Sequence, residues 1–433
     1  MWDRPDEQLR WDVLETHFEE ACFLWTQWEG NLSSPRYTLT DVAGGNELRL
    51  RAHLRALVLG GPRVAERLLI PALGDEDPEK LRVASYTLLA MDGYTDLVAR
   101  TFKEAPDEQR GAMARALSLS ERPGLSKQLL PLLAVDDPDL QATLLDVLSF
   151  RRGLPPEPLL RLSQHEVPRV QAAALRAACT ASLPEDPRLL RKLLGSPSAA
   201  VRAAGLHWGL VRNSREAFLA CLDWSDTRDE AGDLARLAMS MGGEPAHLTR
   251  VLRLLDVSTL RREALWALGF SGKVAAVEAC LPWLRDPKHA SVAAEAFCAI
   301  TGLVLTERFR KERDEELDLE EDGSVEEALD AHLELPRPEA IETWWAEARP
   351  RFGKDARYLS GRPFTTEALV ESLSGAATRR RAPLALELAI RTQGRHALEV
   401  LDFSHLQTHR LTELRSLGSR ALWTGPFLTQ MSH

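Results

Sequence analysis

The sequence lacks the features by which several protein classes are recognised. It has 5 cysteines among 433 residues and no Cys-x-x-Cys pair, so we expect neither a disulfide framework nor a cysteine-based metal site. No apolar run reaches the roughly 18 residues of a membrane span, and the segment 1–7 has no apolar signal core. We therefore expect a soluble, cytoplasmic protein. Its cysteines should be small buried side chains in a reducing compartment. They are Cys22, Cys179, Cys221, Cys280 and Cys298.

Motifs that carry chemistry are also missing. The chain has no GxxxxGK[ST], GxGxxG, GxSxG or HExxH motif, the patterns of phosphate loops, nucleophile elbows and zinc peptidase helices. His405 and His409 are four residues apart but have no evident third ligand. The acidic run from Asp318 fits part of a calcium loop, but Leu329 stands where that loop needs a Glu. The sequence therefore predicts no metal, no cofactor and no enzyme.

What the sequence does have is a repeat of about thirty residues. Each copy contains an apolar residue, usually followed by Arg or Gln, and then small residues. The second positions fall at 82, 110, 141, 171, 202, 230, 261 and 293, with a degenerate copy near 230. Such a period indicates stacked helix pairs, each too small to bury its apolar face alone. The sequence therefore predicts an all-α, HEAT-like α-solenoid.

The turns inside the repeats support this fold. An acidic or small residue followed by Pro recurs before the second helix of a copy. Asp or Ser caps free N–H groups of that helix, and Pro at its first position loses no intrahelical bond. These turns are Asp77-Pro78, Asp137-Pro138, Val167-Pro168, Ser196-Pro197 and Asp286-Pro287.

Charge and composition divide the chain into four predicted parts. Residues 1–67 form a helical cap with one apolar stripe, and 68–306 form the solenoid. Residues 307–334 carry a net charge of -9 and should be a solvated acidic connector, whereas 335–433 carry +4 and form a smaller helical, Trp/Arg-rich region. We expect the connector to be exposed, although an acidic lid over the Arg-rich tail remains an alternative. The stripe of the cap is Leu14, Phe18, Ala21, Trp25 and Trp28.

Four arginines recur at equivalent places in the repeats. They should line one side of the stacked helices, where they could bind an acidic partner. A structural role is the stronger interpretation, because such side chains pair with turn carboxylates such as Asp77, Asp137 or Asp256 and fix the spacing of repeats. The arginines are Arg82, Arg110, Arg202 and Arg261.

Further stretches give the chain a family resemblance. It resembles a little-characterised proteobacterial family of HEAT-like proteins over nearly its whole length, although Arg55 stands where that family has an acidic residue. The resemblance implies an association with type VI secretion gene clusters, among adaptor, effector and immunity proteins, and carries no catalytic residue. The stretches are Phe23-Leu24-Trp25, 50–54, 296–302, Trp344-Trp345, Arg351-Phe352, Arg357-Tyr358, Gly361-Arg362-Pro363 and 379–388.

The C-terminal region holds the predicted partner contact. Trp, Tyr and Arg dominate interface hot spots, and they gather here. Adjacent tryptophans on a helix point about 100° apart, so one of the pair should pack inside while the other meets solvent or a partner; alternatively, both anchor the tail. The candidate residues are Trp344, Trp345, Arg357, Tyr358 and Arg362.

The functional prediction is a non-enzymatic scaffold that binds another protein, such as an adaptor or chaperone-like accessory for a type VI secretion effector. One alternative is an immunity protein that neutralises a toxin. Another is a degenerate HEAT-like enzyme of the lyase or base-excision type. HEAT-like enzymes that bind iron have repeated His-Glu pairs, whereas this chain has only the pair His165-Glu166. The net charge of -5 over residues 1–306 argues against nucleic acid as the partner.

Overall fold

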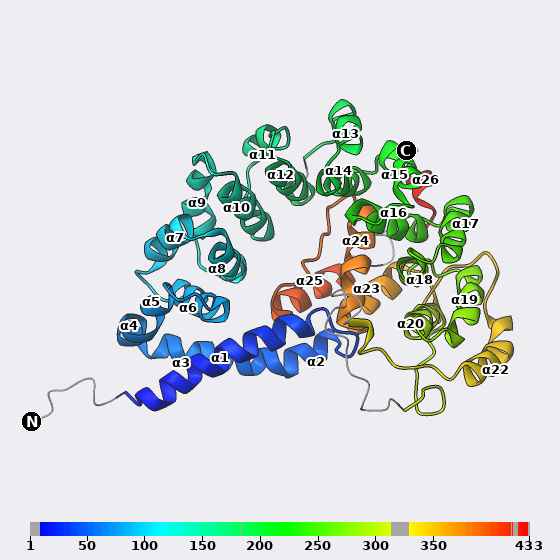
Figure 1. The fold of residues 1–433 in the computed structure, drawn as a ribbon, viewed down its shortest axis with the longest axis horizontal. Coiled ribbons are helices and arrows are strands. Elements are labelled where there is room, and N and C mark those ends of the chain that lie inside the picture. Colours follow the sequence, from blue (N-terminus) through cyan, green and yellow to red (C-terminus); the bar gives the residue numbers. More distant parts are fainter. Residues whose placement is uncertain (1–8, 182, 313–328, 417, 419–422, 432–433) are drawn as a thin grey trace, which may run out of the picture. The chain divides into compact units, whose positions relative to one another are not determined.

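The computed structural model describes residues 9–181, 183–312, 329–416, 418 and 423–431. The chain is 69% helix and 1% strand, and its helices pack one after another along the sequence (Figure 1). It divides into two compact units. Unit 1 comprises Met1–Leu32, Leu39–Leu183 and Leu401–Gln407, and unit 2 comprises Ser33–Thr38, Pro184–Val400 and Thr408–His433. This division cuts across the predicted solenoid and the predicted C-terminal region.

Unit 1 begins with a long helix packed on α3, followed by helices in two rows. In Figure 1, α6, α8, α10 and α12 lie side by side, with α7, α9 and α11 along one side of them. The predicted apolar stripe of the first helix is buried throughout. The helices are α1 (Trp11–Asn31), α2 (Leu39–Gly44), α3 (Asn46–Leu59), α4 (Gly61–Val64), α5 (Ile70–Ala72), α6 (Pro78–Ala90), α7 (Thr95–Glu104), α8 (Asp107–Leu119), α9 (Leu125–Leu129), α10 (Pro138–Phe150), α11 (Pro156–Leu162) and α12 (Pro168–Thr180).

Unit 2 repeats this arrangement and adds C-terminal elements. Helices α14, α16, α18 and α20 form a row, and α24 packs on the first two of them. The elements are α13 (Pro187–Leu194), α14 (Ala199–Val211), α15 (Arg215–Trp224), α16 (Glu230–Met241), α17 (Pro245–Arg253), α18 (Arg261–Leu268), α19 (Val274–Cys280), α20 (Ala290–Thr301), α22 (Pro338–Ala348), β1 (Tyr358–Leu359), β2 (Arg362–Pro363), α23 (Thr366–Gly375), α24 (Arg381–Arg391), α25 (Ser404–Ser416, whose first four residues belong to unit 1) and α26 (Phe427–Gln430).

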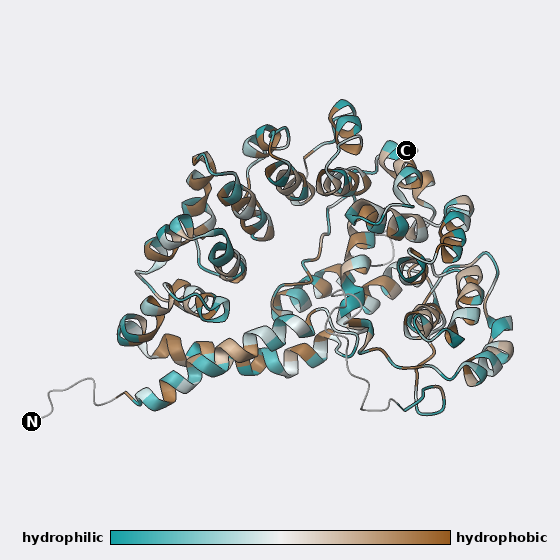
Figure 2. Ribbon diagram, viewed as in Figure 1, coloured by the Kyte–Doolittle hydropathy of each residue, from teal (hydrophilic) through white to brown (hydrophobic). Residues whose placement is uncertain are grey.

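The turn chemistry read from the sequence sets the starts of α6 and α10, whereas α14 and α20 begin two and three residues after the predicted Pro197 and Pro287. Asp77 accepts hydrogen bonds from the backbone N–H groups of Glu79 and Lys80, and Asp137, two repeats later, caps α10 in the same way. In both helices Pro occupies the first position, where its missing N–H costs no helical bond. Most helices carry both apolar and polar residues (Figure 2), as expected of helices buried along one side.

A buried carboxylate fixes the segment Leu401–Gln407 in unit 1. Glu47 of α3 is 1% exposed. It accepts hydrogen bonds from Trp28 Nε1 at 2.9 Å and from the N–H and hydroxyl of Ser404 at 3.0 and 2.6 Å. Phe403 is fully buried beside it and stacks on Trp28, with ring centroids 4.8 Å apart. A segment far along the chain thereby completes the core around α1 and α3.

The recurring arginines make intrachain contacts, as their structural interpretation expects. Arg110 donates to Ala105 O at 3.0 Å and to Asp137, the cap of α10, at 3.2 Å. Arg202 pairs with Asp229, the cap of α16, at 2.6 Å. Such a side chain links one repeat to the helix start of the next. Burial would raise the pKa of Asp229, but hydrogen bonds from Gly232, Thr227 and Arg202 and the charge of Arg202 lower it.

The other two arginines have partners that the sequence did not suggest. Arg82 lies one position later in its helix than Arg110 does and pairs with Glu29 of α1 at 3.4 Å, instead of with Asp77. Arg261 donates to Leu255 O at 2.8 Å and lies over the ring of Trp283. Whether any of the four also meets a partner protein stays a prediction.

The degenerate repeat is completed by a different arginine. In α16, Asp233 stands at the helix position that Arg202 has in α14. Arg236, one turn later and 1% exposed, pairs with Asp233 and donates to Ser225 O and Thr227 O at 2.7 and 2.8 Å. The turn between α15 and α16 therefore still accepts hydrogen bonds from a guanidinium group, although the arginine is not at the position that the repeat predicts.

Both ends of the predicted acidic connector pack against the protein. Lys311 N donates to Leu335 O at 2.8 Å, and Phe309 and Leu333 are each 8% exposed. Asp330 is only 16% exposed and pairs with two arginines of unit 2. The expectation of a solvated connector is therefore wrong for these ends, because apolar side chains and a paired carboxylate anchor them. Most of the acidic run, residues 313–328, lies outside the described residues.

The cysteines follow the sequence-based expectation of small buried side chains. All five cysteines are free, four are buried and Cys298 is intermediate. Burial raises the pKa of the Cys280 thiol to about 12.

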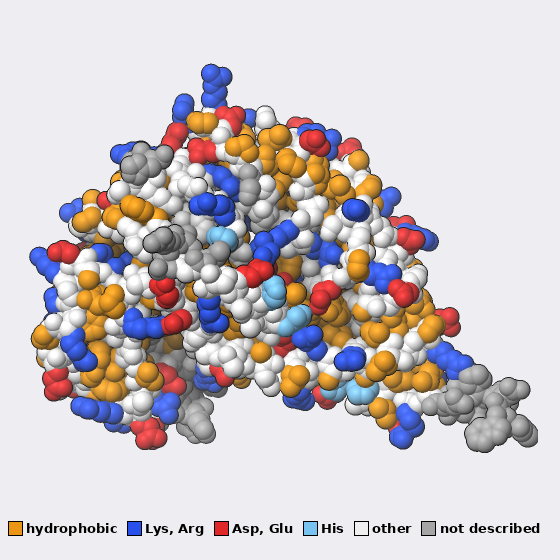
Figure 3. Space-filling model, turned by 180° about the vertical axis from the view of Figure 1, so that it is seen from behind, with side chains coloured by type: hydrophobic (Ala, Val, Ile, Leu, Met, Phe, Trp, Pro, Cys, Tyr) orange, Lys and Arg blue, Asp and Glu red, His pale blue; other side chains and the backbone are white. Residues whose placement is uncertain are grey.

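No described helix is long and apolar enough to cross a membrane. Figure 3 shows acidic and basic side chains interspersed on the face it presents. Exposed pairs such as Arg176 with Asp146 contribute only about 0–1 kcal/mol each.

Candidate functional site

The two adjacent tryptophans of α22 have different surroundings. Trp345 is 5% exposed, and its ring lies 5.6 Å from that of Phe297 and 5.3 Å from that of Phe352. Trp344 is half-buried and lies 6.1 Å from Phe297. The expectation that one packs inside is confirmed, and Trp344 is the one with surface available to a partner.

Arg357 is built into the core of unit 2. Its guanidinium donates to Ser271 O at 3.1 Å, to Phe270 O at 2.8 Å and to the carboxylate of Glu387. Glu387 is fully buried and also receives Arg391 Nε at 2.8 Å. Burial alone would raise the pKa of Glu387, but the charges of both arginines and their hydrogen bonds lower it. Arg357 therefore holds the C-terminal region to the α18–α19 turn.

Tyr358 and Arg362 belong to a two-stranded hairpin. Tyr358 is 8% exposed, its N–H donates to Gly272 O at 2.8 Å, and its hydroxyl accepts from Gly353 N at 2.7 Å. The hairpin turn needs a glycine, because Gly361 has φ +77° and a Cβ there would lie 2.6 Å from Thr301 O. Arg362 is exposed and pairs with Glu371. Of the five predicted contact residues, only Trp344 and Arg362 keep substantial surface.

A buried run of arginines leads into α24 and ends at Arg381, the first residue of that helix. Arg379 is 8% exposed, Arg380 7% and Arg381 0%. The segment Ser33–Thr38 holds this run in place: Tyr37 O accepts from Thr378 N at 2.7 Å and Ser34 O from Arg379 N at 3.1 Å. In the sequence, residues 379–388 stand out only through the family resemblance. No local pattern distinguishes these buried arginines from surface ones.

Two carboxylates face the arginine run. Asp330 receives Arg262 Nε at 2.6 Å and Arg379 Nη2 at 2.9 Å. Glu295 of α20 lies 3.6 Å from Arg379 Nε and 3.8 Å from Arg380 Nη1, too far for hydrogen bonds. Burial raises the pKa of Glu295, although the charges of Arg380 and Arg379 act to lower it. These arginines and carboxylates, which we call the arginine cluster, therefore satisfy only some of one another's hydrogen-bonding groups. The cluster comprises Arg262, Arg379, Arg380, Glu295 and Asp330.

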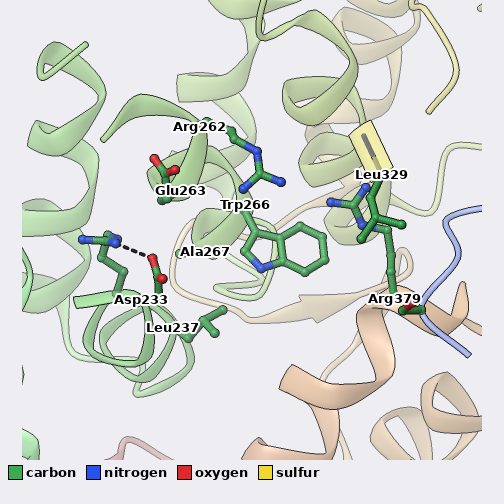
Figure 4. Close-up of a pocket in the computed structure, with 10 residues that line it drawn as sticks. Asp233, Leu237, Arg262, Glu263, Trp266, Ala267, Leu329 and Arg379 are labelled. Atoms are coloured by element: carbon green, nitrogen blue, oxygen red, sulfur yellow. Dashed lines mark hydrogen bonds and ion pairs between the residues drawn. The ribbon is translucent and has the colours of Figure 1, made fainter. Parts of the chain in front are cut away.

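Beside the cluster is a cavity of about 350 Å³, which we call the Trp266 pocket (Figure 4). The guanidinium groups of Arg262 and Arg379 turn toward each other beside the ring of Trp266, and Glu263 lies on the other side of that ring. Arg379 and Arg380 also lie over the ring, at 4.6 and 5.2 Å from its centroid. The lining residues are Ser33, Asp233, Arg236, Leu237, Arg262, Glu263, Trp266, Ala267, Leu329 and Arg379.

A second cavity of about 400 Å³ adjoins Arg357 and Arg391. The donors of these side chains are largely occupied: Arg391 gives hydrogen bonds to Glu387, Trp423 O, Gly425 O and Met241 O. Lys273, also in its wall, donates to Asp355 O at 2.7 Å. Burial and the charge of Arg357 lower the pKa of Lys273. Because its guanidinium groups already have acceptors, this cavity is the weaker binding candidate.

The two histidines considered as ligands have carboxylate neighbours. His405 Nε2 lies 3.4 Å from Glu121, and His409 Nδ1 lies 3.6 Å from Glu413. Among the residues that the structure describes, no group of three His, Cys, Asp or Glu side chains is placed to hold a metal ion.

Comparison with known proteins gives only distant likenesses. No family model and no curated protein matches the chain. Among solved structures, Escherichia coli YibA is 16% identical over 58% of this chain and 87% of its own, with a TM-score of 0.30. Human deoxyhypusine hydroxylase is 18% identical over 56% of this chain and 97% of its own, with a TM-score of 0.25. Kap95p, from a complex with RanGDP, is 13% identical over 90% of this chain and 55% of its own, with a TM-score of 0.31. These values place the chain in no family.

Proposed function

We propose that this chain is a HEAT-like scaffold without a reaction of its own, and that it binds another protein through the Trp266 pocket of unit 2. The observation that carries the proposal is the pocket's composition. A half-buried Trp lies between buried arginines on one side and a carboxylate on the other. Trp and Arg in a partly desolvated hollow are the residues on which binding energy most often concentrates.

The other candidate side chains support a structural role more than a second partner-binding surface. Arg357 and Tyr358 are occupied by intrachain hydrogen bonds, and the recurring arginines reach turn carbonyls or carboxylates. Side chains engaged in this way fix the packing of helices. The Trp266 pocket differs because buried polar atoms in and beside its wall, Arg379 Nη1 and Glu295 Oε2 among them, have no hydrogen-bond partner in the described residues.

The family resemblance suggests which partner to expect. We propose a cytoplasmic adaptor or chaperone-like accessory that binds a type VI secretion effector. An immunity protein would bind only a toxin, whereas an adaptor should bind an effector together with a delivery component. The two roles therefore differ in which proteins bind to the chain.

Affinity capture from the native cell separates these outcomes. A tagged chain expressed at its natural level should retain an effector and a delivery component, identified by mass spectrometry, while the tag alone should retain neither. Capture of one toxin whose activity is abolished would replace the adaptor by the immunity role. If no protein is enriched over the tag alone, the scaffold proposal fails.

A further inference from the structure

The second cavity of unit 2, which we call the Lys273 cavity, has a wall rich in cations. Its volume of about 400 Å³ is within the range of pockets for small molecules. Lys273, Arg357 and Arg391 supply the positive charges, and Asp355 is the one acidic side chain among the described residues that line it. Apolar surface is present in the same wall, from Ala356, Pro363, Phe364 and Pro426.

The two arginines of this wall share a single carboxylate. Glu387, which is fully buried, receives hydrogen bonds from both. The other described bonds of Arg357 and Arg391 go to neutral backbone carbonyls. One positive charge of the pair is therefore not balanced by Glu387, and Lys273 adds a second. Burial lowers the pKa of Lys273, and the charge of Arg357 lowers it further, although Asp355 acts to raise it.

The ammonium group of Lys273 is within reach of a ligand. Lys273 is half-buried, and its Nζ donates to Asp355 O at 2.7 Å in an exposed contact. An ammonium group has three N–H donors, so two are left for another acceptor. No ion pair joins Lys273 to a carboxylate of the described residues. A bound anion would therefore gain these donors without displacing a partner of the protein.

The contacts already made in the wall decide which anion fits. A carboxylate matches the planar fork of a guanidinium group, but Arg357 already holds Glu387 with both of its Nη atoms. Lys273 supplies a point charge with rotatable donors, which suits a tetrahedral phosphate. A phosphate dianion would balance the two positive charges that Glu387 leaves. Asp355 is exposed, so water and salt screen its repulsion, and Thr424 adds a hydroxyl to the wall.

We infer that the Lys273 cavity binds the phosphate group of a small phosphorylated molecule, with Lys273 as its direct contact and Phe364 beside its apolar part. The Lys273 cavity and the Trp266 pocket share no lining residue. The inference therefore goes beyond the proposed function and does not depend on it.

Two probes that share a phenyl ring test the inference on the wild-type chain. Isothermal titration calorimetry at constant ionic strength measures the binding of phenyl phosphate and of benzoate, at about pH 7.5, where a phosphate monoester is mostly a dianion. We expect phenyl phosphate to bind at least tenfold more tightly than benzoate. Equal binding of the two probes, or no saturable binding of phenyl phosphate, would overturn the inference.

Variants place the binding at Lys273. Lys273→Met should weaken the binding of phenyl phosphate at least tenfold, because it removes a charged donor. Lys354→Met is the matched control: Lys354 is exposed and does not line the cavity, so binding should stay within twofold of the wild type. Unchanged binding in Lys273→Met, or the same loss in both variants, would show that phenyl phosphate binds elsewhere.

A second measurement decides if Lys273→Met does not fold. The side-chain NMR signals of isotope-labelled lysines can be assigned by their loss in Lys273→Arg and Lys354→Arg, which keep the charge. In the wild type, phenyl phosphate should shift the signal of Lys273 more than that of Lys354. A signal of Lys273 that does not move would overturn the inference.

Discussion

Replacing Glu387 by Ala should lower the free energy of unfolding by about 3–5 kcal/mol. Glu387 is fully buried between Arg357 and Arg391 and receives hydrogen bonds from both. Its removal leaves two buried guanidinium groups without their carboxylate, and such uncompensated charge is among the most costly single changes in a folded protein. Urea unfolding followed by far-UV circular dichroism measures the loss.

Glu371→Ala is the matched control. Glu371 pairs with Arg362, but both side chains are about half exposed, at 50% and 54%. Water and salt replace such a pair easily, so the variant should lose no more than about 1 kcal/mol. Similar losses in the two variants would show that the buried triad does not hold the C-terminal region in unit 2.

The second large effect should come from Phe403→Ala, with a loss of about 3–5 kcal/mol. Phe403 is fully buried, stacks on Trp28 and meets Tyr86 edge-on at 5.8 Å. Alanine would leave a cavity in the core of unit 1 and weaken the attachment of Leu401–Gln407. Thermal unfolding should accordingly begin at a lower temperature.

Leu401→Ala tests whether this loss is specific to the buried ring. Leu401 is two residues away in the same segment and is 45% exposed, so its truncation should cost well under 1 kcal/mol. A Phe403→Ala variant as stable as the wild type would mean that the segment is not part of the folded core.

The local rules of the sequence were sufficient for the helices. The stripe from Leu14 to Trp28 and the Asp-Pro starts of α6 and α10 follow from periodicity and capping, which act between residues close in the chain. The period also predicted that the recurring arginines pair with turn carboxylates, and Arg110 does so with Asp137.

The Trp266 pocket could not be found in this way. A run of three arginines ordinarily indicates a solvated surface, and Asp330 stands in an acidic stretch that we expected to be exposed. Their burial depends on Ser34, Trp266 and Glu295, which are distant in sequence. Similarly, Trp and Arg of the C-terminal region indicated a binding surface by composition alone, whereas the hydrogen bonds of Arg357 give it a structural role.

The most direct measurement is the affinity of the captured partner for two Leu→Asp variants. Leu237 lines the Trp266 pocket, and Leu222 is 39% exposed on α15 of the same unit but does not line it. We predict that Leu237→Asp weakens binding at least tenfold, because it replaces apolar surface of the pocket by a third carboxylate beside Asp233 and Glu263, and that Leu222→Asp leaves binding within twofold of the wild type. Equal affinities of both folded variants and the wild type, with binding lost instead in Trp344→Ala, would contradict the proposal and move the contact to α22.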